Sequence, residues 1–153
     1  MTSRDLNDLS PVVKDQAIKL VDEVKVKLGI RIIITCTKRD QTDQCCLYLQ
    51  GRVALDLVNY FRASFGLLKT NSINIVTWTL RSRHYPNKDG KSEAFDVVIY
   101  KEGNCYWDVD KTDINADQIP DYKQIAEIGR KIGLKPGADF GDYAHFQNAS
   151  LPI

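Results

Sequence analysis

The amino-acid sequence predicts an α+β fold, a single domain with a small antiparallel sheet and flanking helices. Three observations support this prediction. An amphipathic helical segment lies near the start of the chain, short β-branched and aromatic runs lie in its middle, and a second amphipathic helix lies near its end. Turn-forming residues separate the later runs, as in hairpins. The 153 residues are enough for one domain with a buried core.

The helix expected over residues 11–28 is the best marked element. Ser10 precedes it as an N-cap, Pro11 fits its first turn, and Gly29 follows as a C-terminal stop. Apolar side chains recur at helical spacing and predict its buried face: Val12, Ala17, Leu20, Val21, Val24 and Leu28.

A strand and a second helix are expected next. Residues 30–37 form a β-branched run, which is typical of a buried strand. The pattern of residues 39–52 predicts a helix with Asp40 or Thr42 as its N-cap. The pattern of residues 53–74 is poorer and indicates a short helix with a loop.

The following segments predict extended structure and turns. Residues 73–80 are apolar enough for a strand or an extended segment, and turn-forming residues make 83–93 a loop. Residues 94–100 and 105–110 are expected to pair as a hairpin around a turn at 102–104.

A last helix is expected over residues 121–134, with Asp121 as its cap, before a turn-rich stretch and a final extended segment. Its expected inner face consists of Tyr122, Ile125, Ala126, Ile128, Gly129 and Ile132.

The polar loop before this helix resembles part of a calcium site. Asp113, Asn115 and Asp117 occupy the first, third and fifth positions of an EF-hand-type loop. Gln118 and Gln124 stand where such a loop has Gly and Glu. We therefore favour a polar loop, with Ca²⁺ binding at Asp113, Asn115 and Asp117 as the weaker alternative.

Composition narrows the class of function. Hydrophobic residues make up 43% of the chain and charged residues 27%, a balance typical of soluble globular proteins. The net charge of +1 provides no general attraction to nucleic acid or to an anionic membrane surface. No run approaches the roughly 18 apolar residues that cross a bilayer, and the polar N-terminal segment lacks the apolar core of a secretory signal peptide. We therefore expect a protein first held in a cytosol, without a nucleic-acid partner or membrane insertion.

The cysteines show no spacing typical of disulfide frameworks or zinc knuckles. Cys45 and Cys46 are adjacent, while Cys36 and Cys105 lie apart, and no C-x-x-C pair occurs. Free, mostly buried thiols are the simplest interpretation, and a soft metal site of scattered cysteines is the alternative.

Two histidines and two aspartates are the main candidates for chemistry. A catalytic zinc site needs three nitrogen or oxygen ligands and an open position. His84, Asp96 and His145 supply such a set if their extended segments are neighbours in the sheet. Asp142 lies close to His145 in the sequence and is placed to accept a proton from water. On spacing alone, the alternative is a loop histidine, a core histidine and surface carboxylates.

The local sequences around these residues resemble a group of zinc peptidases that cut bacterial cell-wall peptides. "SRH" followed by "GKSEAFDVV" resembles the S-x-H…A-x-D element of the lysostaphin, D-Ala-D-Ala peptidase and hedgehog (LAS) group. "GLKPGADFGDYAHFQ" is similar to its C-terminal element, G-L-x-W-G-G-D-W/F followed by (D/E)-x-x-H-F-Q. "ITCTKRDQTDQCCLYLQGR" and "IVTW" resemble its upstream elements. The blocks span about residues 30–147 in the family's order and most resemble the phage L-alanyl-D-glutamate peptidases, the endolysins.

The resemblance implies a hedgehog/D-Ala-D-Ala peptidase-like fold with one zinc ion per chain. His84, Asp96 and His145 would be the zinc ligands. Asp142 would take the place of the catalytic carboxylate, with orientation of His145 as its alternative role. Arg39 matches the arginine expected to hold the substrate carbonyl as it becomes an oxyanion, and an ordinary ion pair is its alternative.

Further matches and departures concern the surroundings of the metal. Ser82, beside the first ligand, is implied to make a supporting hydrogen bond, and Gln44 and Gln50 match positions with a structural task. The loop between His84 and Asp96 and the stretch over 53–74 are longer than is usual in the family. "KPGAD" lacks the family's tryptophan, which concerns a pocket wall and not the metal.

The implied function is zinc-dependent hydrolysis of the L-Ala–D-Glu bond of peptidoglycan stem peptides for host cell lysis. Residues 1–153 would form one catalytic domain without a separate wall-binding domain. It would be a monomer that a membrane pore protein releases from the host bacterial cytoplasm to the periplasmic wall. The alternatives are a D-Ala-D-Ala carboxypeptidase or dipeptidase with the same zinc set, and a zinc-bearing binding module without hydrolysis.

Overall fold

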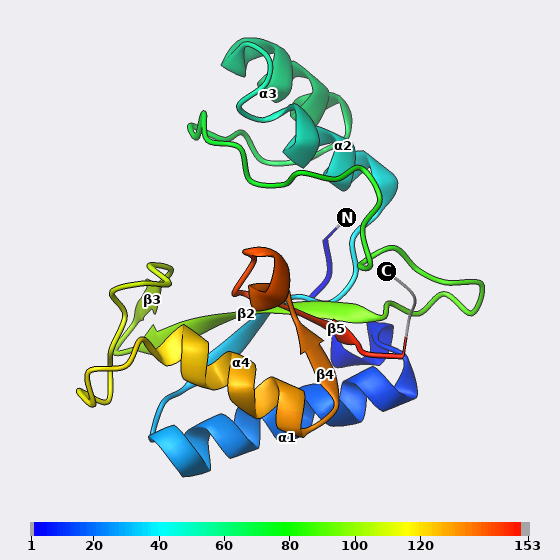
Figure 1. Ribbon diagram of the computed structural model, residues 1–153. Helices are drawn as coiled ribbons and strands as arrows, with labels where there is room; N and C mark the ends of the chain where they lie inside the picture. The colour runs from blue at the N-terminus through cyan, green and yellow to red at the C-terminus, as the bar shows by residue number, and fades with distance from the viewer. Residues whose placement is uncertain (1, 151–153) are drawn as a thin grey trace.

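A computed structural model describes residues 2–150, which form an α+β fold as predicted (Figure 1). The helices are α1 (Pro11–Leu28), α2 (Gln41–Leu49), α3 (Leu55–Ser64) and α4 (Asp121–Lys131), with the 3-10 turns η1 (Leu6–Asp8) and η2 (Gly137–Phe140). The strands are β1 (Ile32–Cys36), β2 (Ala94–Lys101), β3 (Asn104–Tyr106), β4 (Leu134–Pro136) and β5 (His145–Asn148).

Strand β2 is the centre of an antiparallel sheet with the order β1–β2–β5–β4. β1 pairs with one edge of β2, while β5 and β3 share the other edge, near its start and its end. The register places Cys36, Asp96 and His145 side by side across β1, β2 and β5. Two residues after His145 on β5, and so on the same face of the sheet, Gln147 pairs with Lys135 of β4. Because directly paired residues share a face, polar side chains gather on one side of the sheet.

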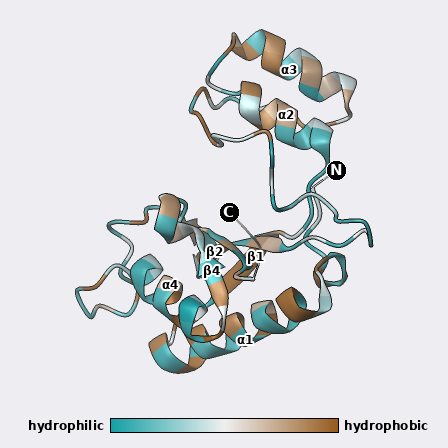
Figure 2. Ribbon diagram, turned by 45° about the vertical axis from the view of Figure 1, so that its right-hand side comes forward, coloured by the Kyte–Doolittle hydropathy of each residue, from teal (hydrophilic) through white to brown (hydrophobic). Residues whose placement is uncertain are grey.

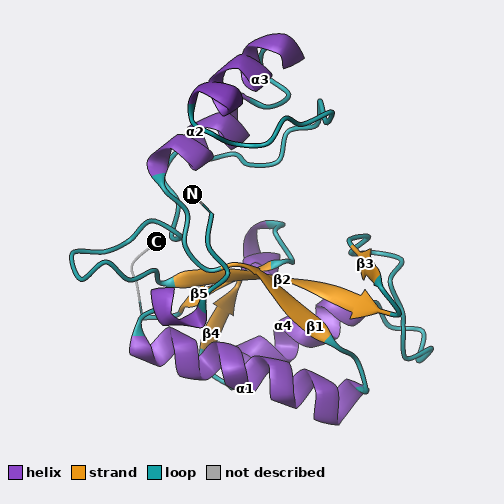
Figure 3. Cartoon of the chain, turned by 180° about the vertical axis from the view of Figure 1, so that it is seen from behind, coloured by secondary structure: helices purple, strands orange, loops and turns teal. Residues whose placement is uncertain are grey.

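The opposite face of the sheet carries the hydrophobic core. Phe95, Val97 and Ile99 of β2 alternate with Asp96 and are fully buried. Helices α1 and α4 cover this face (Figure 3). Phe146 of β5 stacks on Phe95 with 5.7 Å between ring centroids. The core therefore fixes the two strands whose alternate residues form the polar row.

Helix α1 has the predicted bounds, and Gly29 ends it in the left-handed conformation at φ 69°. Ser10 stands at the N-cap, but its hydroxyl makes no capping bond and instead donates to Glu93 at 2.9 Å. The predicted apolar face is wrong at one position, because Val13 is buried whereas Val12 is 59% exposed.

Two predicted elements differ from the structure. Of the two choices predicted for residues 73–80, the strand does not form, and the segment lies along α2 and α3 without regular secondary structure (Figure 1). The second strand of the predicted hairpin is shorter than expected, since β3 ends at Tyr106. In α2, Asp40 is the N-cap, as one of the two predicted choices, and its carboxylate accepts the Asp43 N–H at 2.8 Å.

The last helix also differs from its prediction. α4 ends at Lys131 because Gly133 turns the chain at φ 89° and Leu134 already belongs to β4. Asp121 is not the cap, since Pro120 occupies that position, and the Asp121 carboxylate accepts the Ile114 N–H at 2.6 Å. The buried inner face of α4 is confirmed from Tyr122 to Gly129.

Helices α2 and α3 and the segment 65–80 form a small lobe (residues 40–80) that stands over the polar face of the sheet (Figures 1 and 2). Cys46 and Val58 are buried between its helices. The Gln50 side chain donates to the Asn74 carbonyl at 3.2 Å and ties α2 to the following segment. None of the helices in residues 2–150 is long and apolar enough to cross a membrane.

Candidate metal centre

Three side chains meet above the polar row of the sheet. His84 Nε2 lies 3.0 Å from Asp96 Oδ1 and 3.2 Å from His145 Nδ1. His145 Nδ1 lies 3.0 Å from the same Asp96 oxygen. Both histidines are buried, at 2% and 8% exposure. The structure therefore brings the three predicted ligands together in a triangle of two nitrogens and one oxygen.

This triangle matches the donor set and size of a zinc site. Zinc bonds of about 2.0–2.1 Å at tetrahedral angles place neighbouring ligand atoms about 3.3 Å apart. The observed separations of 3.0–3.2 Å are close to this value. Three protein ligands also leave a fourth position for water or substrate, as in catalytic zinc sites.

The second nitrogen of each imidazole faces an acceptor. His84 Nδ1 lies 3.4 Å from the Thr37 carbonyl, and His145 Nε2 lies 3.2 Å from Gln147 Oε1. Because these oxygens only accept, the two nitrogens carry the ring protons. His84 Nε2 and His145 Nδ1, which hydrogen-bond to Asp96 when no metal is bound, are therefore the nitrogens whose lone pairs a metal at the centre of the triangle would take.

His84 reaches the centre from a loop and not from a strand, so the predicted arrangement of three neighbouring strands is wrong. Its carbonyl accepts the Arg39 N–H at 3.0 Å, which ties the loop to the end of β1. Ser82 Oγ accepts the His84 backbone N–H at 3.2 Å. Ser82 thus supports the backbone of the first candidate ligand instead of its ring.

Arg39 connects the metal centre to the lobe. Its Nη2 lies 3.3 Å from Asp96 Oδ2, and its Nη1 donates to Gln44 Oε1 at 2.9 Å. Gln44 is 1% exposed and donates to the Thr79 carbonyl at 2.7 Å and to Thr77 Oγ1 at 3.1 Å. The ion pair considered as the alternative for Arg39 is thus formed with a candidate ligand, while its oxyanion role stays a prediction.

Cys36 is a neighbour of the site that the sequence did not single out. Cys36, His84 and Asp96 form a buried cluster that could hold a metal ion. The Cys36 thiol lies 3.5 Å from His84 Nδ1 and 3.5 Å from an Arg39 nitrogen. Burial raises the pKa of this thiol to about 11, so it stays protonated near neutral pH. We therefore favour the triangle that includes His145, because its three atoms face one another directly.

The carboxylates and imidazoles shift one another's protonation. Burial raises the pKa of Asp96, but the charge of His84 and the hydrogen bonds from both imidazoles outweigh it and lower the pKa overall. For His145, burial lowers the pKa, and the hydrogen bond and charge of Asp96 raise it above its ordinary value. The Asp142 side chain is exposed at the cavity surface, but many protein atoms lie around it and partly desolvate its carboxylate. This desolvation, together with the charge of Asp96, raises the pKa of Asp142.

Asp142 is placed by a close approach between two backbone segments. Its N–H donates to the Gly137 carbonyl at 2.8 Å, and its own carbonyl accepts the His145 N–H at 3.1 Å. A Cβ atom on Gly137 would lie 2.2 Å from the Asp142 carbonyl oxygen. Only glycine fits here, so Gly137 fixes the turn that carries Asp142 towards the centre.

The triangle lies in the wall of a cavity of about 600 Å³ on the polar side of the sheet. Residues of the sheet and of the lobe line this cavity, and Trp107 and Phe140 add exposed aromatic rings. Its charged side chains are those of Arg39, Arg81, Arg83, Lys135, Asp96 and Asp142. A cavity of this size accommodates a small ligand or a short peptide segment.

The oxygens of the candidate calcium loop bind backbone amides. The Asp113 carboxylate accepts the N–H groups of Asp117 and Gln118, and Asn115 Oδ1 accepts the Asp117 N–H. Asp117 in turn accepts the Ile119 N–H at 2.9 Å. These bonds shape the turn, as the polar-loop interpretation expects.

Comparison with known proteins bears on the fold. No family model matches the chain, and no curated protein does. The crystal structure of the Serratia marcescens L-Ala D-Glu endopeptidase ChiX superposes with a TM-score of 0.52 at 19% sequence identity. The alignment covers 97% of this chain and 88% of that chain. The likeness thus extends over nearly the whole length of both proteins and shows that they share a fold.

Proposed function

We propose that this protein is a zinc-dependent peptidase that hydrolyses the L-Ala–D-Glu bond of peptidoglycan stem peptides. The observation that carries the proposal is the triangle of His84, Asp96 and His145 in a cavity wall, with the Asp142 carboxylate nearby. The fold shared with an L-Ala D-Glu endopeptidase supports the choice of substrate. The sequence blocks around the same residues support it independently.

The chemistry requires a nucleophile, a proton carrier and a stabiliser of negative charge. Zinc held by the two histidines and Asp96 would lower the pKa of water towards about 7 and polarise a carbonyl group. Asp142 would take the proton of the attacking water and return it to the leaving amine, and its raised pKa suits both transfers. The Arg39 guanidinium, which lines the cavity, would stabilise the oxyanion while its Nη2 holds Asp96 Oδ2.

We also propose a biological setting, on the resemblance of the sequence blocks alone. The protein would be a phage endolysin that acts as a monomer on the periplasmic wall of its bacterial host. A membrane pore protein would give it access from the cytoplasm. Peptidoglycan would then be its macromolecular partner.

Digestion of purified peptidoglycan tests the function. The zinc-loaded protein is incubated with peptidoglycan, and new termini are mapped by mass spectrometry. Release of N-terminal D-Glu is the expected result. Loss of terminal D-Ala alone would instead identify a carboxypeptidase, and the absence of any new terminus would leave a binding module.

Two substitutions separate metal binding from proton transfer. Asp142→Ala should abolish hydrolysis and keep one zinc per chain, because Asp142 is not a ligand in the proposed set. His145→Ala should lose both zinc and hydrolysis. Metal content by mass spectrometry and turnover of the same peptidoglycan give the two readouts, and an active Asp142→Ala protein would contradict the assigned proton carrier.

A further inference from the structure

We propose that Lys135 forms a subsite for a free carboxylate of the substrate, one strand away from the metal centre. This inference rests on the proposed function, since the identity of the carboxylate follows from a peptidoglycan stem peptide. It adds a determinant of specificity that lies outside the metal ligands and the proton carrier.

The sheet places Lys135 beside the metal centre. Lys135 of β4 pairs with Gln147 of β5, and Gln147 Oε1 lies 3.2 Å from His145 Nε2. Paired residues share a face, and adjacent strands lie about 4.8 Å apart. The flanking residues Leu134 and Pro136 are buried towards the core, whereas Lys135 lines the cavity. Lys135 is therefore one strand from a candidate zinc ligand, on the same face of the sheet.

Lys135 has no ionic partner among the residues that the structure describes. Its side chain is half-buried, and within residues 2–150 its ammonium makes no hydrogen bond or ion pair. Elsewhere, Lys38 pairs with Asp8 and Arg130 pairs with Asp139. A partly desolvated cation without a counter-charge gains most from an anionic ligand.

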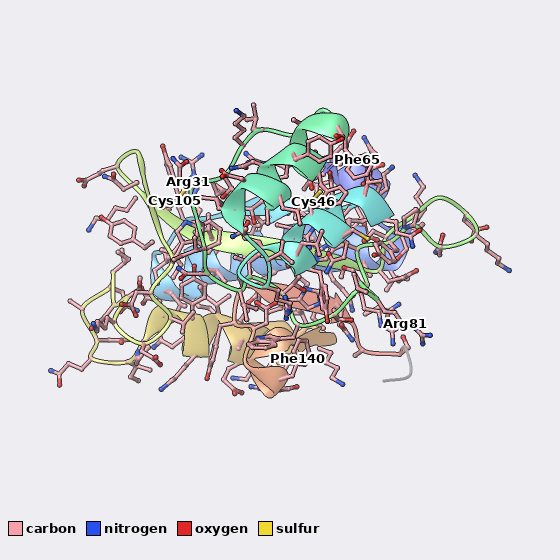
Figure 4. The ribbon with its side chains drawn as sticks, turned by 90° about the horizontal axis from the view of Figure 1, so that it is seen from above. Arg31, Cys46, Phe65, Arg81, Cys105 and Phe140 are labelled. Carbon is pink, nitrogen blue, oxygen red and sulfur yellow. The ribbon has the colours of Figure 1, made fainter. Side chains whose placement is uncertain are left out.

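The net charge of the cavity also favours an anionic ligand. Four of its side chains are cationic and two are acidic, although the chain as a whole has a net charge of only +1. One of the two acids, Asp96, is already engaged by both imidazoles and Arg39. Arg81, in the loop before His84, is a second cation of the cavity wall, and its side chain makes no hydrogen bond or ion pair within residues 2–150 (Figure 4). A divalent metal would raise the positive charge further, so the cavity favours an anionic peptide.

The substrate carries an anion at the corresponding place. In stem peptides the D-Glu residue is joined onward through its γ-carboxyl group, so its α-carboxylate is free on the carbon that bears the scissile amine. Asp142, the proposed proton donor to that amine, ends the turn that begins directly after β4. Lys135 and Asp142 thus lie on the β4 side of the centre, where the leaving residue and its carboxylate would be held.

The experiment compares two synthetic stem peptides that differ only at this group, one with the free α-carboxylate and one with its α-amide. We expect the wild-type, zinc-loaded protein to prefer the acid by about tenfold in kcat/KM, the value of one charge-assisted hydrogen bond. Lys135→Gln should lower kcat/KM for the acid by about tenfold, mainly through KM, and leave the amide within about twofold. Lys135→Arg should restore most of the preference.

A matched control removes the same charge elsewhere. Lys131 is exposed at the end of α4 and does not line the cavity, so Lys131→Gln should leave both substrates unchanged. Thermal melting of each variant checks that folding is intact. Equal cleavage of acid and amide by the wild type, or an equal loss of both in Lys135→Gln, would overturn the subsite while leaving the peptidase function in place.

Binding to the zinc-loaded Asp142→Asn protein makes the inference independent of turnover. Calorimetry should give a Kd about tenfold lower for the acid peptide than for the amide, and Lys135→Gln in this background should remove the difference. If neither peptide is cleaved by the wild type but this binding preference holds, the proposed reaction fails and the carboxylate subsite stands. Equal affinities for the two peptides would overturn the subsite.

Discussion

A single methyl group on Gly137 should disturb both the site and the fold. Gly137 opens η2, and a Cβ atom there would lie 2.2 Å from the Asp142 carbonyl oxygen and 2.8 Å from His145 Cβ. Neither neighbour is the far end of a flexible side chain, so no rotamer change relieves the contact. We therefore expect Gly137→Ala to displace both the proposed proton carrier and a proposed ligand.

The size of the effect follows from these distances. Non-bonded carbon contacts are optimal at about 3.5–4.0 Å, so the backbone must shift by about 1 Å. Overpacking of this kind costs about 1–3 kcal/mol, and a backbone clash belongs at the upper end. A misplacement of about 1 Å in an active site can lower the rate about 100-fold. We expect Gly137→Ala to lose about 3 kcal/mol of unfolding free energy and about 100-fold in kcat/KM.

Gly129→Ala is the matched control on the other side of β5. Its Cβ would lie 2.5 Å from Phe146 Cε1, which is a side-chain ring atom and not backbone, so a small turn of the ring relieves the contact without moving the strand. Alanine also gains about 0.8–1 kcal/mol over glycine inside a helix, which offsets part of the crowding. We therefore expect a loss of about 0–2 kcal/mol and a kcat/KM within a few-fold of the wild type, since Asp142 is untouched.

Urea unfolding and stem-peptide turnover measure these two quantities for both variants, and zinc competition with a chromophoric chelator shows whether His145 is displaced. Wild-type stability and turnover in Gly137→Ala would refute the close approach on which this reasoning depends. Equal losses of turnover in the two variants would show that general destabilisation, and not the placement of Asp142, controls activity.

Three further outcomes are expected. Gln147→Leu removes the acceptor that orients His145, so zinc affinity should fall about 10–100-fold in chelator competition, and an unchanged affinity would contradict the assigned ring tautomer. Cys36→Ala should still bind one zinc with similar affinity, because the Cys36 thiol faces His84 Nδ1, which is not the nitrogen turned to the centre of the triangle, and loss of the metal would make Cys36 a ligand instead. Burial raises the folded-state pKa of Asp121, so the folded protein binds this proton more tightly than the unfolded chain does. The stability of the wild type relative to Asp121→Asn should therefore decrease as the pH rises from 4 to 7, and urea unfolding that shows a constant difference would refute this.

The ends of helices could be predicted from the sequence because they depend on interactions between residues that are close together in the chain. Gly29 stops α1, and Asp40 caps α2, through interactions within a few residues. His84 and His145 are the only two histidines, so a metal site with imidazole ligands has no other choice. The resemblance of the sequence around His84 and Asp96 to the S-x-H…A-x-D element then identified Asp96 as the third candidate ligand. Local chemistry was thus enough to name the candidate ligands.

Long-range pairing could not be predicted in the same way. The apolar pattern of 73–80 suits a strand, but β1 occupies one edge of β2, and β5 and β3 occupy the other. Cys36 lies at the site because it pairs with Asp96 across β1 and β2, and Lys135 lies there because it pairs with Gln147 across β4 and β5. Such registers depend on the whole sheet, so a single sequence does not specify them locally.

The candidate metal centre has two kinds of structural support, a floor formed by strands and walls formed by other segments. Asp96 and His145 lie on strands whose alternate residues, Phe95 and Phe146, are locked into the core, so the floor of the cavity is fixed by packing. The walls come from the lobe, from η2 and from β4, and Arg39 links the lobe to the floor because it donates to Gln44 Oε1 and pairs with Asp96. Changes in the walls can therefore alter which peptide binds without moving the ligands. This separation explains how the long segment within the lobe is compatible with the observed triangle, and in the proposed peptidase it would leave substrate choice to residues outside that triangle.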